Sequence, residues 1–423
     1  MIRPIRQSPP LPCPPPVGGR VGWGVGPSLV LLGVLALSLS GCQSMGAAFS
    51  NTVSGTIDMV MGGGDTTEPP KPLEKIEPEI EIETVWDEDA GAGDGGQWLS
   101  LGVAGKGDRL YVADHEGRVT AFNLQTGDEI WQVDTGLALS AGPALGMGKV
   151  LLGTIEAQVV ALDQDSGERL WTGQVSSEVL APPRAGRKEV AVHTVDGAVF
   201  ALDIDSGERL WSTDQQVSPL SLRGLGAPEI LEDKVLVGFA NGRMAMMRLS
   251  DGKVDWEKQV AVPSGMSELE RVVDIDATPV IRDGMVYVTA YHGGVIAATL
   301  LDGEVIWRNE EIIASASPTI TWRYLFVTDT DSDVWGLDET TGRTYWKQAA
   351  FHHRRLTAPV PYGEWLAVGD YKGYVHFLAQ EDGRQVGRER VFRSPIRTPP
   401  VVIGDVLIVY SSGGDVAVLK VEH

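Results

Sequence analysis

Three aspartates at alternate positions are the first residues whose types and spacing could bind a ligand. Asp329, Asp331 and Asp333 occur in the stretch DTDSDVW, which begins like a calcium-binding loop. Such a loop needs glycine at its sixth position and a bidentate glutamate at its twelfth. This sequence has Val334 and Thr340 at those positions. The stretch is therefore predicted to be a turn with solvated carboxylates and not a calcium site.

The histidines and the common catalytic motifs give no better candidate. No pair of histidines has the His-Glu-x-x-His spacing of a zinc protease, and no Gly-x-Ser-x-Gly nucleophile motif occurs. We therefore predict no catalytic residue and no metal site. The histidines are His115, His193, His292, His352, His353, His376 and His423.

Two further stretches have the composition of binding motifs. GAGDGG, residues 91–96, fits the Gly-x-Gly-x-x-Gly pattern of dinucleotide sites, but that fingerprint needs a strand before it and a helix after it. The flanking WDEDA and QWLSL do not fit this context, so a flexible loop is predicted. FHHRRL, which begins at Phe351, is the one basic cluster. A solvated connection is favoured there over a ligand-binding patch.

Cys42 carries a different chemistry, because it directly follows an apolar run. Residues 29–39, LVLLGVLALSL, are short for a membrane span and have arginines upstream, as in a secretory signal. The LSGC that ends at Cys42 resembles the lipobox of bacterial lipoproteins. This resemblance implies removal of residues 1–41 and acylation of Cys42, and Gln43 after it implies sorting to the outer membrane. The alternative is an ordinary signal peptide followed by a chance cysteine.

Charge and composition describe the chain that follows. The full chain of 423 residues has a net charge of −22, which opposes binding to phosphate backbones, so nucleic acid is excluded as a partner. Residues 42–79 are rich in Gly, Ser, Thr, Pro and Glu and are predicted to be a flexible tether. Within them, FSNTVSGTIDMVM has an alternative interpretation as a short amphipathic segment on the membrane surface. No cysteine follows Cys42, which excludes a disulfide in the folded part.

A repeated phrase organises residues 80–423. A glycine followed after three residues by a tryptophan recurs at spacings of 40, 40, 45, 51 and 39 residues. A degenerate copy has Gly387 in the tryptophan position, 41 residues later. A period of this length with strand-like segments is typical of propeller blades. The tryptophans of these copies are Trp131, Trp171, Trp211, Trp256, Trp307 and Trp346.

Each repeat contains four predicted strands. A first run such as EVAVHT is followed by a turn, often Asp-Gly or Asn-Gly as at Asp196-Gly197 and Asn241-Gly242, which suits a two-residue hairpin. A second run such as VFALD comes after the turn. A third strand starts near the tryptophan, and a fourth carries proline after small residues, as in LAPP and GAPE. Because proline cannot donate to a strand ladder, this fourth strand is predicted to be the innermost strand, facing the central channel.

The two ends of the chain are predicted to share one blade. Eight runs of the VYV type are present, and the last unit stops at VAVLKVEH without an outer strand after it. A strand with Trp86, IEIETVWDED, precedes the first full repeat. We therefore predict an all-β, eight-bladed β-propeller of four-stranded antiparallel blades, closed by the N- and C-terminal strands. Trp86 and the repeat tryptophans are predicted to wedge between neighbouring blades.

The blade phrase ALDxxSGExLW resembles the repeat of pyrroloquinoline-quinone-dependent dehydrogenases. Those enzymes are eight-bladed propellers that hold the quinone at the axis with a calcium ion, an aspartate base and commonly a disulfide of adjacent cysteines. This sequence has no cysteine after Cys42, and no such ligand set is found. A non-enzymatic protein without a cofactor is therefore favoured, and a periplasmic dehydrogenase of this kind is the alternative.

A second resemblance extends from the lipobox to His423. The lipobox, the tether and eight such blades are similar to the BamB family, lipoproteins of the bacterial outer-membrane β-barrel assembly machinery (the BAM complex). SPLSLRGLGAP, residues 218–228, and ELERVVDIDATPV, residues 268–280, match two stretches that are specific to that family. They are also the two longest connections between blades, and extra length in a repeat protein usually maps to a binding face.

The second resemblance implies a lipid-anchored scaffold on the periplasmic face of the outer membrane. The two stretches would contact the POTRA domains of BamA, with other BAM subunits nearby. The protein would assist the delivery and insertion of unfolded β-barrel clients. The alternative for the same residues is that the leucines are buried and the aspartates cap a turn. The implied contact residues are Leu220, Leu222, Arg223, Asp274 and Asp276.

Overall fold

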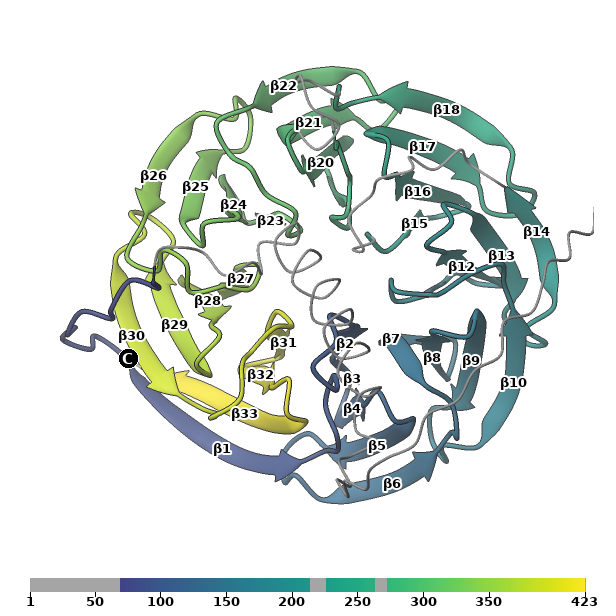
Figure 1. Ribbon diagram of the computed structural model, residues 1–423, viewed down its shortest axis with the longest axis horizontal. Helices are drawn as coiled ribbons and strands as arrows, with labels where there is room; N and C mark the ends of the chain where they lie inside the picture. The colour runs from purple at the N-terminus through teal and green to yellow at the C-terminus, as the bar shows by residue number, and fades with distance from the viewer. Residues whose placement is uncertain (1–68, 214–225, 263–271, 423) are drawn as a thin grey trace, which may run out of the picture. The chain divides into compact units, whose positions relative to one another are not determined.

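The computed structural model describes residues 69–213, 226–262 and 272–422. Within these ranges the chain forms eight sheets arranged in a ring, as Figure 1 shows. Seven sheets have four antiparallel strands, and the eighth has a short fifth strand added in parallel. The predicted all-β, eight-bladed propeller is therefore confirmed. None of the described segments is a helix long and apolar enough to cross a bilayer.

The blades are numbered in chain order, so that blade 1 contains β3 to β6 and blade 8 contains β31 to β33 together with β1. The innermost strands are β3 (Val103–Lys106), β7 (Leu139–Gly146), β11 (Arg184–Ala185), β15 (Glu229–Leu231), β19 (Val280–Arg282), β23 (Thr319–Ile320), β27 (Val360–Tyr362) and β31 (Val401–Ile403). The second strands are β4 (Arg109–Ala113), β8 (Lys149–Thr154), β12 (Glu189–His193), β16 (Lys234–Gly238), β20 (Met285–Ala290), β24 (Tyr324–Thr328), β28 (Trp365–Gly369) and β32 (Val406–Tyr410).

The third strands are β5 (Arg118–Asn123), β9 (Gln158–Asp163), β13 (Val199–Asp203), β17 (Arg243–Arg248), β21 (Gly294–Thr299), β25 (Val334–Asp338), β29 (Tyr374–Ala379) and β33 (Asp415–Glu422). The outer strands are β6 (Glu129–Asp134), β10 (Arg169–Gln174), β14 (Arg209–Thr213), β18 (Val254–Gln259), β22 (Val305–Asn309), β26 (Thr344–Gln348), β30 (Gln385–Arg390) and β1 (Glu81–Asp89). The added strand, β2 (Ser100–Leu101), pairs with β7 of blade 2.

The prolines lie within or directly before the innermost strands, and these strands face the axis as predicted. Each such strand belongs to the next blade rather than to the repeat that precedes it. After Pro228, β15 pairs with β16 and not with the outer strand β14 of the blade before. Each repeat as read from the sequence therefore spans two sheets. The offset follows from the connection itself, because the chain must pass from the rim of one blade to the axis before it starts the next.

Pairing of the two chain ends closes the ring. β1 runs antiparallel to β33, with Trp86 opposite Val418 and Thr84 opposite Leu419. Figure 1 shows β1, near the N-terminal end of the described chain, beside the C-terminal strand β33. The predicted closure is confirmed. It removes the two open sheet edges that a linear array of blades would expose.

The seven blade tryptophans lie at junctions between consecutive blades. Each indole donates its Nε1–H to a backbone carbonyl of the next blade, and the Trp171 bond to Ile204 O is 2.9 Å long. A Cβ added at Gly207 would lie 2.5 Å from the Trp171 ring, so only glycine fits there. The other acceptors are Leu124 for Trp86, Gln164 for Trp131, Leu249 for Trp211, Leu300 for Trp256, Glu339 for Trp307 and Gln380 for Trp346. The repeated glycine and tryptophan therefore meet across a junction.

The junction between blades 7 and 8 is built differently, because blade 7 has Gly387 in the tryptophan position. A Cβ on Gly387 would lie 2.5 Å from Ile80 and 3.5 Å from Ile82. Ile80 is buried in the same core as Val386 and Leu419. The isoleucines that enter with β1 thus fill the space that an indole fills at the other junctions.

The chain contacts the ring before β1 begins. Lys71 donates its backbone N–H to His352 O at 3.0 Å, and Glu79 donates its N–H to Val386 O at 2.8 Å. Leu73 packs against the cluster that contains Phe351 and Trp346. Glu79 also forms an ion pair with Arg384 at 2.9 Å. Residues 71–79, which the sequence placed in the tether, therefore lie along blades 6 and 7.

Candidate partner-binding face

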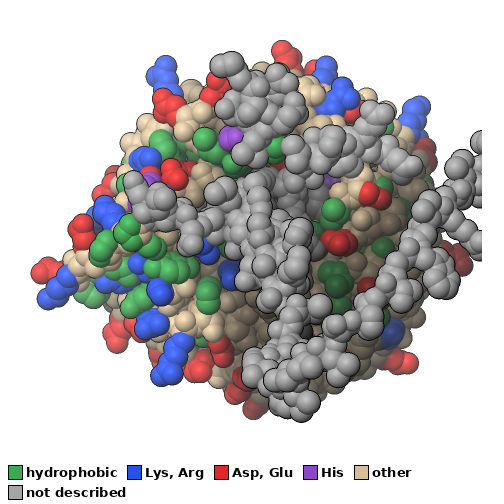
Figure 2. Space-filling model, viewed as in Figure 1, with side chains coloured by type: hydrophobic (Ala, Val, Ile, Leu, Met, Phe, Trp, Pro, Cys, Tyr) green, Lys and Arg blue, Asp and Glu red, His purple; other side chains and the backbone are tan. Residues whose placement is uncertain are grey.

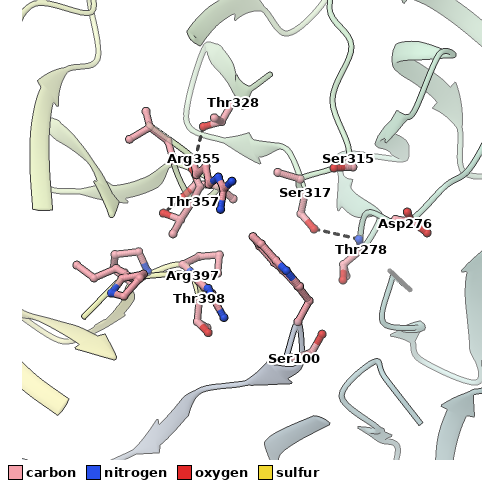
Figure 3. Close-up of a pocket in the computed structure, with 18 of the residues that line it drawn as sticks. Ser100, Asp276, Thr278, Ser315, Ser317, Thr328, Arg355, Thr357, Arg397 and Thr398 are labelled. Atoms are coloured by element: carbon pink, nitrogen blue, oxygen red, sulfur yellow. Dashed lines mark hydrogen bonds between the residues drawn. The ribbon is translucent and has the colours of Figure 1, made fainter. Parts of the chain in front are cut away.

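One end of the ring carries both the connections between blades and the turns between second and third strands. A cavity of about 660 Å³ opens there at the axis. Its wall includes the connection Ser315–Ser317 and residues of the turn that follows β24, among them Thr330. Figure 3 shows side chains from several blades pointing into this space. The two long connections implied as partner contacts start and end at the same face.

The described ends of these two connections are bonded to each other. Ala227 donates its N–H to Thr278 Oγ1 at 3.0 Å. A Cβ on Gly226 would lie 2.4 Å from Ala277 O, so the two backbones touch. Thr278 in turn donates its N–H to Ser317 Oγ at 3.0 Å, the bond drawn in Figure 3. The fold thus brings together two stretches that are far apart in sequence.

Asp274 and Asp276 lie on the second connection but are not equally accessible. Asp274 is only 1 % exposed, and its backbone forms a bridge with Tyr291. Asp276 is partly exposed and lies on the cavity wall, as Figure 3 shows. Burial is the main cause that raises the pKa of Asp276 well above its usual range, and the charge of Asp274 and its acceptance of a hydrogen bond from protonated Asp276 add to it. This environment favours the neutral form of Asp276.

Apolar and neutral groups fix the ends of both connections. Ile275, between the two aspartates, is buried, and a Cβ on Gly238 would lie 2.3 Å from its side chain. His193 is buried with Nδ1 3.5 Å from Gly226 O. Burial lowers the pKa of His193 to about 4, so this ring is neutral at physiological pH. The first long connection also contains Leu220, Leu222 and Arg223. These three residues lie outside the described residues, as does Cys42.

Three arginines lie on the cavity wall: Arg184 on the innermost strand of blade 3, and Arg355 and Arg397 on the connections that lead to blades 7 and 8. Arg184 and Arg397 were missed by the sequence analysis, and Arg355 belongs to FHHRRL, where a solvated connection was favoured over a ligand-binding patch. Each occurs within a few residues of the prolines that mark the innermost strands, in PPRAG, RRLTAP and PIRTPP. That position is the signal that could have identified them, because innermost strands face the axis.

The alternating aspartates form a turn, as predicted, but one carboxylate is buried rather than solvated. Asp329 Oδ1 accepts the N–H groups of Asp331 and Asp333, and its Oδ2 accepts Trp335 Nε1–H. The Asp333 side chain is 3 % exposed and pairs with Lys347 at 2.7 Å. No cluster of three or more His, Cys, Asp or Glu within the described ranges has a geometry that could hold a metal ion.

The FHHRRL connection is not solvated throughout, which corrects the favoured interpretation. Phe351 and Arg354 are buried. The Arg354 guanidinium donates to Asp370 Oδ2 from Nε at 2.9 Å and from Nη2 at 2.5 Å. His376 Nε2 lies 3.0 Å from the same oxygen, and Arg354 Nη1 donates to Lys71 O at 3.4 Å. The basic cluster is therefore a structural ion pair that also holds the segment before β1.

The GAGDGG stretch links β1 of blade 8 to blade 1. Asp94 within it is buried and pairs with Arg397 at 2.7 Å. A Cβ on Gly93 would lie 2.1 Å from Ser412 O, and Gly93 has φ 65°. The glycines therefore permit close backbone packing at the closure of the ring and do not form a nucleotide-binding turn.

Comparisons with known proteins agree on one family and one fold. Residues 115–348 match the family profile described as outer membrane protein assembly factor BamB. The protein of that name from Alkalilimnicola ehrlichii is 50 % identical over 341 residues, which cover 81 % of this chain and 89 % of the relative. The crystal structure of BamB from Moraxella catarrhalis superposes with a TM-score of 0.73 at 27 % identity, covering 80 % of this chain and all of that one.

A europium-containing methanol dehydrogenase also superposes, with a TM-score of 0.65 at 13 % identity, over 80 % of this chain and 93 % of the enzyme. At this level of identity the likeness is one of fold alone. The resemblance of the blade phrase to quinoprotein repeats is accounted for by the shared scaffold.

Proposed function

Because the chain belongs to the family of the outer membrane protein assembly factor BamB, we propose that it is a non-enzymatic scaffold of the machinery that assembles β-barrel proteins in the outer membrane. In this proposal Cys42 is lipidated, residues 1–41 are removed, and the protein is anchored on the periplasmic face. The relatives carry the name of an assembly factor, which favours a scaffold over a quinone-dependent dehydrogenase.

The partner proposed for the two long connections is BamA, through its POTRA domains. The observation that supports this is the bond between Ala227 and Thr278, which joins the connections into one surface. Leu222 and Arg223 would supply an apolar anchor and a charged donor, a composition common at interface hot spots. Asp274 is buried, so its role would be to hold the shape of the second connection rather than to touch BamA.

Copurification from membranes tests this assignment. Changing Leu222, Arg223 and Asp274 together to alanine is expected to lower the recovered BamA roughly tenfold or more, because the loss of hot-spot side chains costs at least 2 kcal/mol. A second variant, Leu222→Ala with Arg223→Ala, leaves the buried Asp274 in place. It should give a similar loss without any change in the thermal unfolding of the propeller.

The matched control changes Leu301 and Arg343 to alanine. Both are exposed and lie in turns between third and outer strands, at the opposite end of the ring. Equal recovery of BamA with the triple variant and the wild type would refute the site assignment. Dye reduction after addition of the quinone and calcium would refute the non-enzymatic part of the proposal.

The outer strands are the proposed site for transient contact with unfolded barrel clients. In every blade the residue before the tryptophan position lies at a register shift of the outer strand. Leu170, Leu210 and Ile306 at these positions are exposed. At blade 7 the equivalent Val386 is buried in the core that contains Ile80, and its carbonyl accepts the N–H of Glu79, from the segment before β1. An extended client strand could bind the other edges in the same way.

Retention of an unfolded barrel client by the purified protein measures this contact. Leu170→Ser together with Leu210→Ser is expected to reduce the retained client several-fold, because each change removes exposed apolar surface at a strand edge. Leu301→Ser, at a turn instead of an edge, should leave retention unchanged. Undiminished retention by the double variant would exclude these edges as the client site.

A further inference from the structure

We propose that the axial cavity is a carboxylate-binding site built around Arg184, Arg355 and Arg397. The three arginines are not among the residues proposed to contact BamA, although the cavity wall also includes Asp276 and Thr278 of the second long connection. The cavity volume of about 660 Å³ lies in the range of small-molecule sites. Several blades contribute to the wall, so the site exists only in the closed ring.

Arg397 is held in a fixed orientation by neighbours that leave it donors to spare. Its Nη1 donates to Asp94 Oδ2 at 2.7 Å, and its guanidinium carbon lies 4.7 Å from the centre of the Trp98 ring. A guanidinium has five N–H donors, and the contact with Asp94 uses one nitrogen. Asp94 is itself buried, so the arginine cannot turn away without leaving a buried carboxylate unpaired. The group is thus preorganised to receive an anion.

Arg355 and Arg184 extend the positive wall. Figure 3 shows Arg355 and Arg397 on the same side of the opening. Arg184 lies on another blade, with Nε 3.8 Å from the nearest Glu229 oxygen, which is longer than a hydrogen bond. The three guanidinium groups line one cavity, and in the proposed site they would engage more than one carboxylate of a single ligand. Planar guanidinium groups match carboxylates in paired hydrogen bonds.

Hydroxyl groups on the opposite wall are arranged as donors. Thr278 Oγ1 accepts the N–H of Ala227, and Ser317 Oγ accepts the N–H of Thr278. Because each oxygen already accepts a backbone N–H, its own hydrogen is available to donate to a ligand oxygen. Figure 3 shows both side chains at the cavity wall across from Arg397. Donors therefore face the cavity from both sides.

The charge balance of the wall also favours an anion. Its two carboxyls are Asp276 and Asp329. Burial is the main reason that the pKa of each is raised, and the neutral form is favoured most strongly at Asp276. Three guanidinium groups thus face two carboxyls on the wall, and the carboxylates that pair with Arg397 and Arg184, Asp94 and Glu229, lie outside it. Figure 2 shows acidic and basic side chains interspersed around the rim, so this concentration of arginine is a local feature. Low-dielectric walls focus such a field on an entering anion.

The ligand is either a free organic polyacid or the acidic tip of a peptide, since both present closely spaced carboxylates. Calorimetry on the full chain in detergent would use citrate, and fluorescence anisotropy would use a labelled peptide of alternating Asp and Gly. Binding of citrate alone identifies the free acid as the source, and binding of the peptide without citrate competition below millimolar concentration identifies the peptide. Failure of both to bind in the millimolar range would overturn the proposal.

Affinity measurements on arginine variants test whether the ligand binds in this cavity. Arg184→Gln with Arg355→Gln keeps the Arg397–Asp94 pair and is expected to weaken binding about 100-fold, roughly tenfold for each arginine that no longer donates a charge-assisted hydrogen bond to the ligand. Arg118→Gln with Arg343→Gln removes the same charge from exposed positions outside the cavity wall and should leave affinity unchanged.

Three results would contradict the site. They are equal affinity in the cavity variant and the wild type, equal binding of a peptide with Asn in place of Asp, and binding of inorganic phosphate as tight as that of citrate. Near-ultraviolet circular dichroism of each variant checks that the ring remains folded. Because BamA recovery does not enter these measurements, their failure is distinct from failure of the proposed scaffold function.

Discussion

Trp171→Ala is expected to lower the free energy of unfolding by about 3–5 kcal/mol, the cost typical of removing a buried aromatic side chain. Trp171 is 7 % exposed and lies at the junction of blades 2 and 3. Its ring covers Gly207 of the next blade, and its Nε1–H bonds to Ile204 O. Truncation would leave both a cavity and an unpaired carbonyl at a junction that the closed ring needs. Urea unfolding followed by tryptophan fluorescence and by circular dichroism measures the loss.

The neighbouring residue provides the control. Leu170 is 44 % exposed on the same strand, so Leu170→Ala is expected to change the free energy of unfolding by less than about 1 kcal/mol. Trp171→Phe keeps an aromatic ring but loses the indole donor, and it should fall between the two. Similar losses for Leu170→Ala and Trp171→Ala would show that junction packing does not determine the stability of the ring.

Asp370→Asn is expected to cost about 3–5 kcal/mol, because it leaves the buried Arg354 without its counter-charge. The side chains of Asp370 and Arg354 are 0 % and 6 % exposed, and Asp370 also contacts His376. Asparagine keeps the shape of the side chain, including the oxygen that accepts the N–H groups of Lys372 and Tyr374. The measured loss would therefore report the charge rather than the packing. Urea unfolding at neutral pH measures it.

Two further measurements isolate this ion pair. Arg354→Met combined with Asp370→Asn should cost less than the sum of the single changes, since neither variant residue is then a buried charge. Asp165→Asn removes an exposed ion pair with Arg109 and should cost less than about 1 kcal/mol. Additive losses in the double variant would show that Arg354 and Asp370 do not stabilise each other.

The same ion pair predicts the direction in which the stability of the protein changes with pH. Burial alone would raise the pKa of Asp370, but hydrogen bonds and charge from His376, with those of Tyr374 N–H and Arg354, lower it overall. A carboxyl with a lowered pKa in the folded state contributes stability above its unfolded pKa, near 4, and loses it as the pH falls through the folded value. Asp370→Asn should remove this part of the acid sensitivity.

The fold could be predicted because its main contacts repeat. Seven indoles occupy equivalent junctions, so their spacing in the sequence reports the spacing of blades directly. Closure of the ring could be predicted because the sequence has an extra strand before the first full repeat and lacks an outer strand after the last one. The offset between repeat and blade was missed, because sequence order does not show that the proline strand leaves its own repeat to pair with the next.

The contacts that occur once could not be predicted in the same way. Ile80 fills the space beside Gly387, but no spacing relates residues so far apart in sequence. FHHRRL was interpreted as solvated because its partner carboxylate, Asp370, lies on the following blade. The cavity arginines come from different connections, so their convergence becomes apparent only when the ring closes. Contacts that repeat in every blade can be recognised in the sequence, whereas contacts between residues of different connections can be recognised only in the three-dimensional structure.

The contacts made ahead of β1 determine how the propeller bears mechanical load. A pull on the chain from its N-terminal side reaches Lys71 first, then Glu79, and only afterwards β1. The bonds of Lys71 to blade 6 and of Glu79 to blade 7, including the Glu79–Arg384 ion pair, must break before force can peel Glu81 from Glu422 at the end of the β1–β33 ladder. The closing strand is thereby shielded from tension.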